Sequence, residues 1–156
     1  MISVLFVCLG NICRSPMAEA VFRNQLQLAH LTSHIKTDSA GTGDWHVGQP
    51  PHEGTQKKLR AEGISVDGIY ARQIHPDDLK NFTYIVVMDH SNFENVTQLA
   101  SGATSSIHHL VDFIPDTSYR EVPDPWYTGD FEETYSLVTQ GCTGLLAHIR
   151  KNNPID

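Results

Sequence analysis

The sequence predicts a single α/β domain, residues 1–156, in which a four-stranded parallel sheet is flanked by helices in a three-layer fold. Three observations favour this class. Short apolar segments alternate along the chain with longer segments of helical periodicity, as in sheets that are covered on both faces. The first apolar segment, residues 3–7, lacks the alternation of a half-exposed strand. The 156 residues include 40% hydrophobic and 19% charged side chains, which is the composition of one globular domain.

The predicted strands cover residues 3–7, 35–39, 84–88 and 107–110. The third is the clearest of the later strands, because it reads Tyr-Ile-Val-Val-Met. The second is weaker, and the Gly-Thr-Gly run at residues 41–43 ends it.

The predicted helices cover residues 16–29, 52–62, 91–99 and 131–150. One face of the first helix carries the apolar side chains of Met17, Val21, Phe22 and Leu26. Ser91 is the expected N-cap of the third helix. The last helix is expected to continue through Gly141 and Gly144, although glycine disfavours helix.

The segment between the first strand and the first helix, residues 8–15, reads CLGNICRS and predicts a phosphate-binding loop. A loop of this length that ends at a helix N-terminus can direct several backbone N–H groups at one anion. The planar guanidinium of Arg14 matches two phosphate oxygens. Cys8 is the candidate nucleophile. Ligands of open parallel sheets bind beyond the carboxyl ends of the strands, and Cys8, Gly41 and Asp89 follow three such ends.

A helix N-terminus and a nearby cation both favour a thiolate, so we expect Cys8 to be largely deprotonated at neutral pH. Ser15 has two expected roles. Its hydroxyl can cap the first helix, with Pro16 at the first helical position. It can also donate a hydrogen bond to the Cys8 sulfur and so make that sulfur a better leaving group. The other loop residues expected to surround the phosphate are Leu9, Gly10, Asn11, Ile12 and Cys13.

The composition argues against several kinds of partner and cofactor. The net charge is −7 and no basic cluster offsets it, so nucleic acid and anionic membranes are poor partners. Three cysteines without disulfide spacing fit a reducing compartment. No apolar run approaches 18 residues, and we expect a cytoplasmic protein. The nine histidines form no metal-binding motif, and His108 and His109 are expected on opposite faces of a strand, so neither a metal nor another cofactor is predicted.

From these motifs the chain resembles the low-molecular-weight protein tyrosine phosphatases. The resemblance is carried first by residues 4–22, VLFVCLGNICRSPMAEAVF. It continues in family order at residues 38–40, 44–45, 48–51, 71–73, 88–92 and 124–127, and so covers essentially the whole chain. The Cys-x5-Arg-Ser loop is shared by unrelated phosphatases, but its position at the N-terminus together with a late Asp-Pro-aromatic segment is specific to this family.

The resemblance implies a metal-free, two-step reaction. Cys8 attacks phosphorus, Arg14 and the loop amides hold the phosphate oxygens, and Asp124 is the general acid that later activates water. Trp45, Trp126 and Tyr127 are implied to border the cleft and contact the substrate ring, which suits phosphotyrosine in particular. The implied substrates are tyrosine-phosphorylated proteins, and the product is inorganic phosphate.

Two cysteines and one departure from the family pattern bear on the loop. Relatives link the asparagine matched by Asn11 to two serines, here Ser15 and Ser39, and to a histidine whose place Ile69 takes in this chain. The outer support of the loop is therefore open. Cys13 is either a packed thiol or, as in relatives, a partner for a reversible disulfide with Cys8. Cys142 is expected in the core.

Three other interpretations remain beside the phosphotyrosine phosphatase. A protein arginine phosphatase uses the same scaffold but has threonine at the place of Ile12 and a different aromatic arrangement after Asp-Pro. A thioredoxin-linked arsenate reductase needs a further cysteine pair, which is missing between Cys13 and Cys142. A silent phosphopeptide-binding module would need neither Cys8 nor Asp124.

Overall fold

One parallel sheet organises the computed structural model, which describes residues 1–100 and 105–155. Its strand order is β2-β1-β3-β4, with bounds β1 Ile2–Cys8, β2 Ile35–Gly41, β3 Tyr84–Val87 and β4 Ser106–His109. In the register of the first pair, Ile2 lies opposite Ile35 and Cys8 opposite Gly41. The predicted fold class is confirmed, and each predicted strand is present within about two residues of its expected ends.

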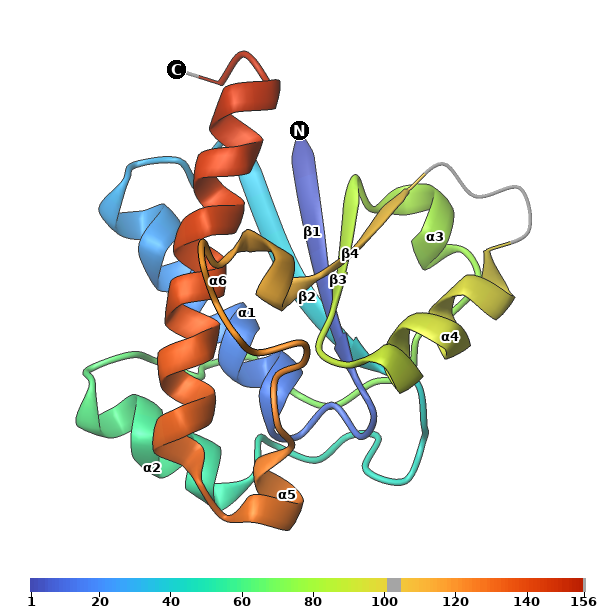
Figure 1. The fold of residues 1–156 in the computed structure, drawn as a ribbon, viewed down its shortest axis with the longest axis vertical. Helices are drawn as coiled ribbons and strands as arrows, with labels where there is room; N and C mark the ends of the chain where they lie inside the picture. Colours follow the sequence, from blue (N-terminus) through green and yellow to red (C-terminus); the bar gives the residue numbers. More distant parts are fainter. Residues whose placement is uncertain (101–104, 156) are drawn as a thin grey trace.

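Helices cover both faces of this sheet (Figure 1). The larger layer contains α1 (Arg14–Leu28), α2 (Glu53–Ala61) and α6 (Phe131–Asn152). The opposite layer contains α3 (Asp78–Asn81) and α4 (His90–Leu99). The 3₁₀-helix η1 (Leu110–Phe113) and the short α5 (Pro125–Thr128) lie on the chain between β4 and α6. Within the described residues, no helix is both long enough and apolar enough to cross a bilayer.

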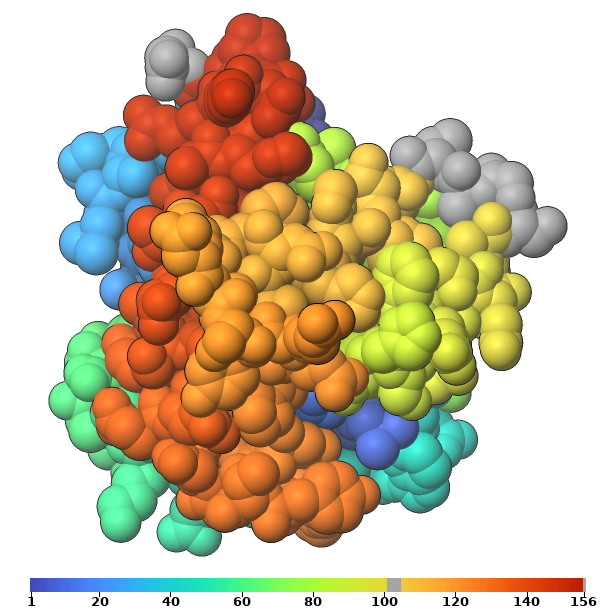
Figure 2. Space-filling view, viewed as in Figure 1, coloured from blue at the N-terminus to red at the C-terminus, as the bar shows by residue number. Residues whose placement is uncertain are grey.

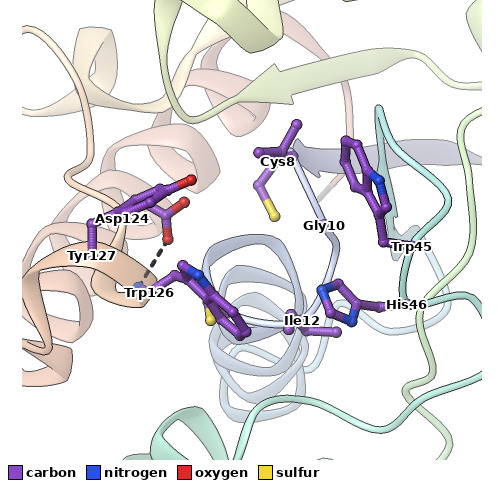
Figure 3. A pocket seen from close by; sticks show the side chains of 10 residues that line it. Cys8, Gly10, Ile12, Trp45, His46, Asp124, Trp126 and Tyr127 are labelled. Carbon is purple, nitrogen blue, oxygen red and sulfur yellow. Dashed lines mark hydrogen bonds between the residues drawn. The ribbon is translucent and has the colours of Figure 1, made fainter.

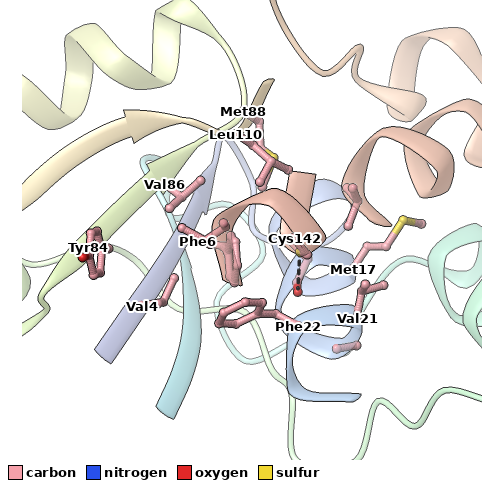
Figure 4. Close-up of a cluster of buried hydrophobic side chains, with 14 of the residues drawn as sticks. Val4, Phe6, Met17, Val21, Phe22, Tyr84, Val86, Met88, Leu110 and Cys142 are labelled. Atoms are coloured by element: carbon pink, nitrogen blue, oxygen red, sulfur yellow. Dashed lines mark hydrogen bonds between the residues drawn. The ribbon is translucent and has the colours of Figure 1, made fainter. Parts of the chain in front are cut away.

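The side chains of β1 divide between the two layers because successive residues of a strand point to opposite faces. Val4 and Phe6 lie in the cluster beneath α1 and α6 (Figure 4), where the rings of Phe6 and Phe22 meet edge to face at 5.6 Å. Leu5 and Val7 lie in the second cluster, beneath α3 and α4. These four side chains are fully buried, which explains why the middle of β1 is uniformly apolar.

The expectation that Ser91 caps the third predicted helix is wrong. Helix α4 begins at His90, and Asp89 is its N-cap. The Asp89 carboxylate accepts a hydrogen bond from the Asn92 backbone at 2.8 Å, and the Asn92 side chain accepts one from the Asp89 backbone at 3.2 Å. This reciprocal pair satisfies two free backbone donors, so it starts the helix before Ser91 is reached.

The long helix α6 continues through Gly141 and Gly144 because both glycines pack against η1. A Cβ atom on Gly144 would lie 1.8 Å from the carbonyl oxygen of Phe113, and one on Gly141 would lie 2.5 Å from the side chain of Leu110. The close approach of two backbones explains why glycine stands inside a helix here.

We expect Gly144→Ala to destabilise the protein by roughly 2 kcal/mol or more. The added methyl group meets a backbone carbonyl that cannot rotate away, and such overpacking outweighs the gain of about 1 kcal/mol in helix propensity. Urea unfolding measures the change. Gly141→Ala is the matched control, since the Leu110 side chain can move, and equal losses in both variants would contradict this explanation.

Candidate active site

The loop after β1 lies at the carboxyl edge of the sheet, at the end of the molecule opposite both termini (Figure 1). The carbonyl groups of this loop accept hydrogen bonds from segments that surround it. The backbone N–H groups of Thr42, Gly43 and His52 donate to Cys8, Leu9 and Ile12, and the Thr55 hydroxyl donates to the Cys13 carbonyl. Because C=O and N–H of one peptide unit point in opposite directions, the N–H groups face the inside of the loop. The loop is thus arranged to hold an anion.

Gly41 allows the loop to rest on the end of β2. A Cβ atom at this position would lie 2.8 Å from the carbonyl oxygen of Leu9 and 3.1 Å from the backbone nitrogen of Asn11. Any larger residue would push the loop away from the sheet, so the turn signal seen in the sequence at residues 41–43 also has a packing role.

Asn11 holds the loop from within. Its backbone is left-handed, with φ of 56°, and its N–H group points at the Cys8 sulfur at 3.3 Å. The side-chain amide donates to the hydroxyls of Ser15 (2.8 Å) and Ser39 (3.0 Å). The amide oxygen accepts from the backbone N–H of Arg72 at 2.9 Å. Asn11 is therefore bonded at both ends of its amide, and the loop has an outer support although Ile69, which stands where the family resemblance implies a histidine, is buried in the core.

The first expected role of Ser15 is wrong, because its hydroxyl does not cap α1. The helix begins at Arg14, and the residue at the N-cap position, Cys13, makes no side-chain capping bond. The Ser15 hydroxyl instead lies 2.9 Å from the Cys8 sulfur and accepts from Asn11. It is fully buried, so its one proton is directed at the sulfur or at the Ala40 carbonyl, which is more distant at 3.5 Å. This geometry agrees with the second expected role.

Arg14 is buried beside the loop and held by two carboxylates. Its Nη1 donates to Asp89 at 2.7 Å and to the Val122 carbonyl at 2.9 Å, and its Nη2 lies 3.4 Å from Asp124. Burial lowers the pKa of the guanidinium, but Cys8, Asp89 and Asp124 outweigh burial and raise the pKa above its ordinary value. The buried Nε has no hydrogen-bond partner within the described residues. A buried donor of this kind is an available contact for an anion.

Asp124 comes to this loop from the far end of the chain. It is the N-cap of α5, where one carboxylate oxygen accepts from the Trp126 backbone at 3.0 Å and the other faces Arg14. The flanking Pro123 and Pro125 limit the backbone of this segment. In Figure 2 the blue surface of the loop after β1 lies between the orange segment that carries Asp124 and the cyan segment after β2. The carboxyl group is partly exposed, with a side-chain exposure of 20%, and so is accessible to a ligand.

A pocket of about 240 Å³ opens over Cys8 (Figure 3). The exposed rings of Trp45, Trp126 and Tyr127 form its walls, and its other lining residues are Cys8, Leu9, Gly10, Ile12, Cys13, His46 and Asp124. The structure thus brings together most of the residues expected from the sequence. Asn11, Arg14 and Ser15 lie beneath the pocket, where they are buried and hold the loop.

Two residues of this site were given no catalytic or substrate-binding role from the sequence, although Asp89 was noted at the end of a strand. His46 lines the pocket, and its ring lies 5.8 Å from that of Trp126. Its position next to Trp45 was the available signal. Asp89 forms the shortest ion pair with Arg14, at 2.7 Å between Nη1 and Oδ2. Its position after β3, at the carboxyl edge of the sheet, was the corresponding signal.

The three cysteines are free thiols. Cys13 is buried, and burial together with the proximity of Cys8 and Asp124 raises its pKa to about 12, so it is a protonated thiol at neutral pH. Cys142 is fully buried in the core, as expected, and its thiol faces the Ala18 carbonyl (Figure 4). Of the two thiols that line the pocket, Cys13 is held in the protonated form, and Cys8 is the one toward which the Asn11 N–H of the loop points.

No cluster of three or more metal-binding side chains occurs in residues 1–100 and 105–155. The two neighbouring histidines of β4 point to opposite faces, as expected. The ring of His108 lies among Tyr84, Phe113 and His148, whereas that of His109 stacks on Phe93 at 4.9 Å.

A thiol, an anion-binding loop with a buried arginine, and a separate carboxyl group in one pocket define an enzyme that hydrolyses phosphate esters. Residues 3–154 match the family model described as low molecular weight phosphotyrosine protein phosphatase. The chain belongs to this family.

Named relatives agree with this assignment over the full length of the chain. The chain is 54% identical over 156 residues to the low molecular weight protein-tyrosine-phosphatase YfkJ of Bacillus subtilis, with 99% of this chain and 100% of the relative covered. It is 45% identical over 152 residues to PtpA of Staphylococcus epidermidis, covering 97% and 96%. The crystal structure of YfkJ superposes with a TM-score of 0.95 at 55% identity, covering 98% of this chain and 97% of that structure.

Proposed function

We propose that this protein hydrolyses phosphotyrosine in proteins through a phosphocysteine intermediate, with Cys8 as nucleophile, Arg14 and the loop amides as phosphate ligands, and Asp124 as general acid and base. The observation that carries the proposal is the buried Arg14 Nε, a donor without a partner in the described chain, beside a loop whose Asn11 N–H points at the Cys8 sulfur. Both are donors for phosphate oxygens, and together they place phosphorus above the thiol.

In the first step the Cys8 thiolate attacks phosphorus, so that a P–S bond forms and the P–O bond to the tyrosyl oxygen breaks. The leaving oxygen takes the proton of Asp124. The three phosphate oxygens that carry the developing charge are held by the loop N–H groups and by Arg14. These donors are fixed before the reaction, and one such donor contributes about 2.7–4 kcal/mol to the stability of the transition state.

In the second step Asp124, now a carboxylate, removes a proton from a water molecule that attacks phosphorus. The P–S bond breaks and inorganic phosphate leaves. The sulfur departs as a thiolate, which the Ser15 hydroxyl, 2.9 Å away, stabilises by donating its proton in a hydrogen bond. The same carboxyl group serves as acid and then as base, as microscopic reversibility requires.

The walls of the pocket support an aryl ester as substrate. Trp45, Trp126 and Tyr127 rise above the loop and provide aromatic faces on which a tyrosine ring can stack. A phosphoserine side chain is shorter, so its phosphate would stop short of the Cys8 sulfur. We infer that the substrates are tyrosine-phosphorylated proteins and that the three free thiols reflect the reducing conditions of the cytoplasm.

The direct test is an assay with p-nitrophenyl phosphate and with matched phosphotyrosine, phosphoserine and phosphoarginine peptides. We expect hydrolysis of p-nitrophenyl phosphate that vanadate blocks and EDTA does not change, and a clear preference for phosphotyrosine among the peptides. Turnover of phosphoarginine alone would replace the substrate assignment. The absence of any turnover would favour a binding module.

Ile12 is the loop residue where this preference is most open to change. It lines the pocket and is 7% exposed, so its side chain presents methyl groups rather than a polar group to the ligand. We expect Ile12→Thr to raise turnover of phosphoarginine relative to phosphotyrosine about fivefold, because one added hydrogen bond contributes about 1 kcal/mol. Ile12→Val, which has the shape of threonine without the hydroxyl, is the control. If both variants keep the original ratio, the aromatic walls alone select the substrate.

A further inference from the structure

Helix α1 carries a buried carboxyl group that the proposed reaction does not use. Glu19 is 8% exposed and lies one turn beyond Ser15 on the same helix. Its Oε1 accepts a hydrogen bond of 2.7 Å from the Ser39 hydroxyl at the end of β2. A buried acid costs free energy, so its partner and its surroundings require an explanation.

Hydrogen bonds connect Glu19 without a break to the Cys8 sulfur. The Ser39 hydroxyl, which donates to Glu19, accepts from the Asn11 side chain at 3.0 Å. The other hydrogen of that amide is donated to Ser15 at 2.8 Å. The Ser15 hydroxyl, 2.9 Å from Cys8, ends the chain.

The order of donors and acceptors in this chain follows from the acceptor at its far end. A hydroxyl has one proton, so Ser39, which gives its proton to Glu19, offers only lone pairs to Asn11. Asn11 then donates through both hydrogens of its amide. Ser15 accepts one of these and keeps its own proton for the sulfur. Hydrogen bonds in such a chain polarise one another, so a stronger acceptor at Glu19 strengthens each link.

The charge on Glu19 is not neutralised by a close cation. Three charged groups face Glu19. Asp38 on β2 is a carboxylate, which has the same sign of charge and does not neutralise it. Arg23 on α1 donates to the carbonyls of Ser65 and Asp67, and Arg72 donates to Asp38 and Asp78. No cation is hydrogen-bonded to Glu19 among the residues that the structure describes, and Ile69 is apolar.

Burial raises the pKa of Glu19 to about 7, against the lowering effect of the Ser39 hydrogen bond. Asp38 adds to the increase, and the two arginines oppose it. The carboxyl therefore changes from mostly neutral to mostly ionised as the pH rises through about 7. An ionised carboxylate is the stronger acceptor, so the links toward Cys8 tighten as the pH rises.

We propose that Glu19 is a positioning residue of this phosphatase, which acts through Ser39, Asn11 and Ser15 to direct the Ser15 proton at the Cys8 sulfur. The proposal rests on the proposed function of the loop and adds an acceptor that sets the direction of its hydrogen bonds. The step that should depend on it is hydrolysis of the phosphocysteine, in which the sulfur is the leaving group.

The first readout is the side-chain amide of Asn11 in ¹H–¹⁵N NMR spectra, which reports on the chain without any turnover. In the wild-type protein we expect both amide hydrogens to shift with a midpoint near pH 7. In Glu19→Gln, which keeps the size of the side chain and an acceptor oxygen, this transition should be lost. Glu53→Gln is the control, because it removes the same charge from an exposed position at the start of α2. An identical transition in wild type and Glu19→Gln would overturn the proposal.

The second readout is kcat for p-nitrophenyl phosphate between pH 5.5 and 8.5. We expect Glu19→Ala to lower kcat about fivefold with little change in KM, and Glu19→Gln to restore the low-pH value while lacking the rise near pH 7. Wild-type values of kcat in both variants would overturn the role of Glu19. If the wild-type protein has no turnover, the proposed function fails. The NMR transition then still decides whether Glu19 controls the chain of hydrogen bonds that leads to Cys8.

Discussion

Cys8→Ser is expected to lower kcat for p-nitrophenyl phosphate by at least about 10⁴-fold, because loss of a covalent nucleophile removes the pathway itself rather than one contact. A serine hydroxyl under the loop is a weak nucleophile without a base at hydrogen-bond distance to take its proton. The anion site above it should remain, since the loop is held by Asn11 and by the outer donors to its carbonyls. The variant should therefore still bind tungstate or a phosphotyrosine peptide, and it is suited to trapping substrates.

Steady-state assays with p-nitrophenyl phosphate measure the loss of kcat, and binding measurements with tungstate or a phosphotyrosine peptide test whether the anion site remains. Cys142→Ala is the matched control, because it removes a fully buried thiol of the core that has no contact with the pocket. It should lose stability but keep its turnover. A Cys8→Ser variant that retains more than a few per cent of wild-type activity would refute the assignment of the nucleophile.

Asp124→Ala is expected to slow hydrolysis of phosphotyrosine and of alkyl phosphates by about 10²–10⁴-fold, the range in which general acids contribute. The p-nitrophenolate ion leaves with little need for a proton, so the loss for p-nitrophenyl phosphate should be clearly smaller in the first step. Rates of phosphoenzyme formation, measured for both kinds of ester, give the comparison. Equal losses for the two would argue against Asp124 as the acid.

A structural effect of the same substitution can be separated from a chemical one. Asp124 also caps α5 through its bond to the Trp126 backbone, so alanine removes both functions. Asp124→Asn keeps an oxygen that can accept the capping bond, but its amide has no acidic proton to give to the leaving oxygen. If Asp124→Asn is as impaired as Asp124→Ala, the chemical role is supported. Recovery of wild-type rates in Asp124→Asn would reduce the role of Asp124 to holding α5.

The local sequence was sufficient to predict the loop and the elements around it. The chemistry of residues 8–15 depends on residues that are adjacent in the chain, and the strand and helix on either side have clear apolar patterns. The start of α4 was misplaced because Ser91 and Asp89 are both good caps. The reciprocal bond with Asn92 favours Asp89. Helices α3 and α5 were missed, since four residues are too few to show a period.

Contacts between distant segments were beyond such prediction. The Asn11 amide oxygen finds its donor on the backbone of Arg72, which has no side-chain signature, and so the loop is supported without the histidine that the family resemblance implied. The ion pair of Arg14 with Asp89 joins residues 75 positions apart. The direction of the Ser15 hydroxyl depends on Ser39 and Glu19, which reach it through the side chain of Asn11.

The run from Cys8 to Ser15 thus determines that a thiol and an arginine share one anion-binding loop, because backbone geometry within eight residues suffices to build it. Which way the hydroxyl of that loop points, which carboxylates hold its arginine and which rings enclose its ligand depend on packing. Ser39 lies in β2, Trp45 in the segment that follows it, and Asp89 directly after β3. Asp124 caps the start of α5, and the rings of Trp126 and Tyr127 belong to that helix. They are assembled only when the parallel strands bring their carboxyl ends to one edge.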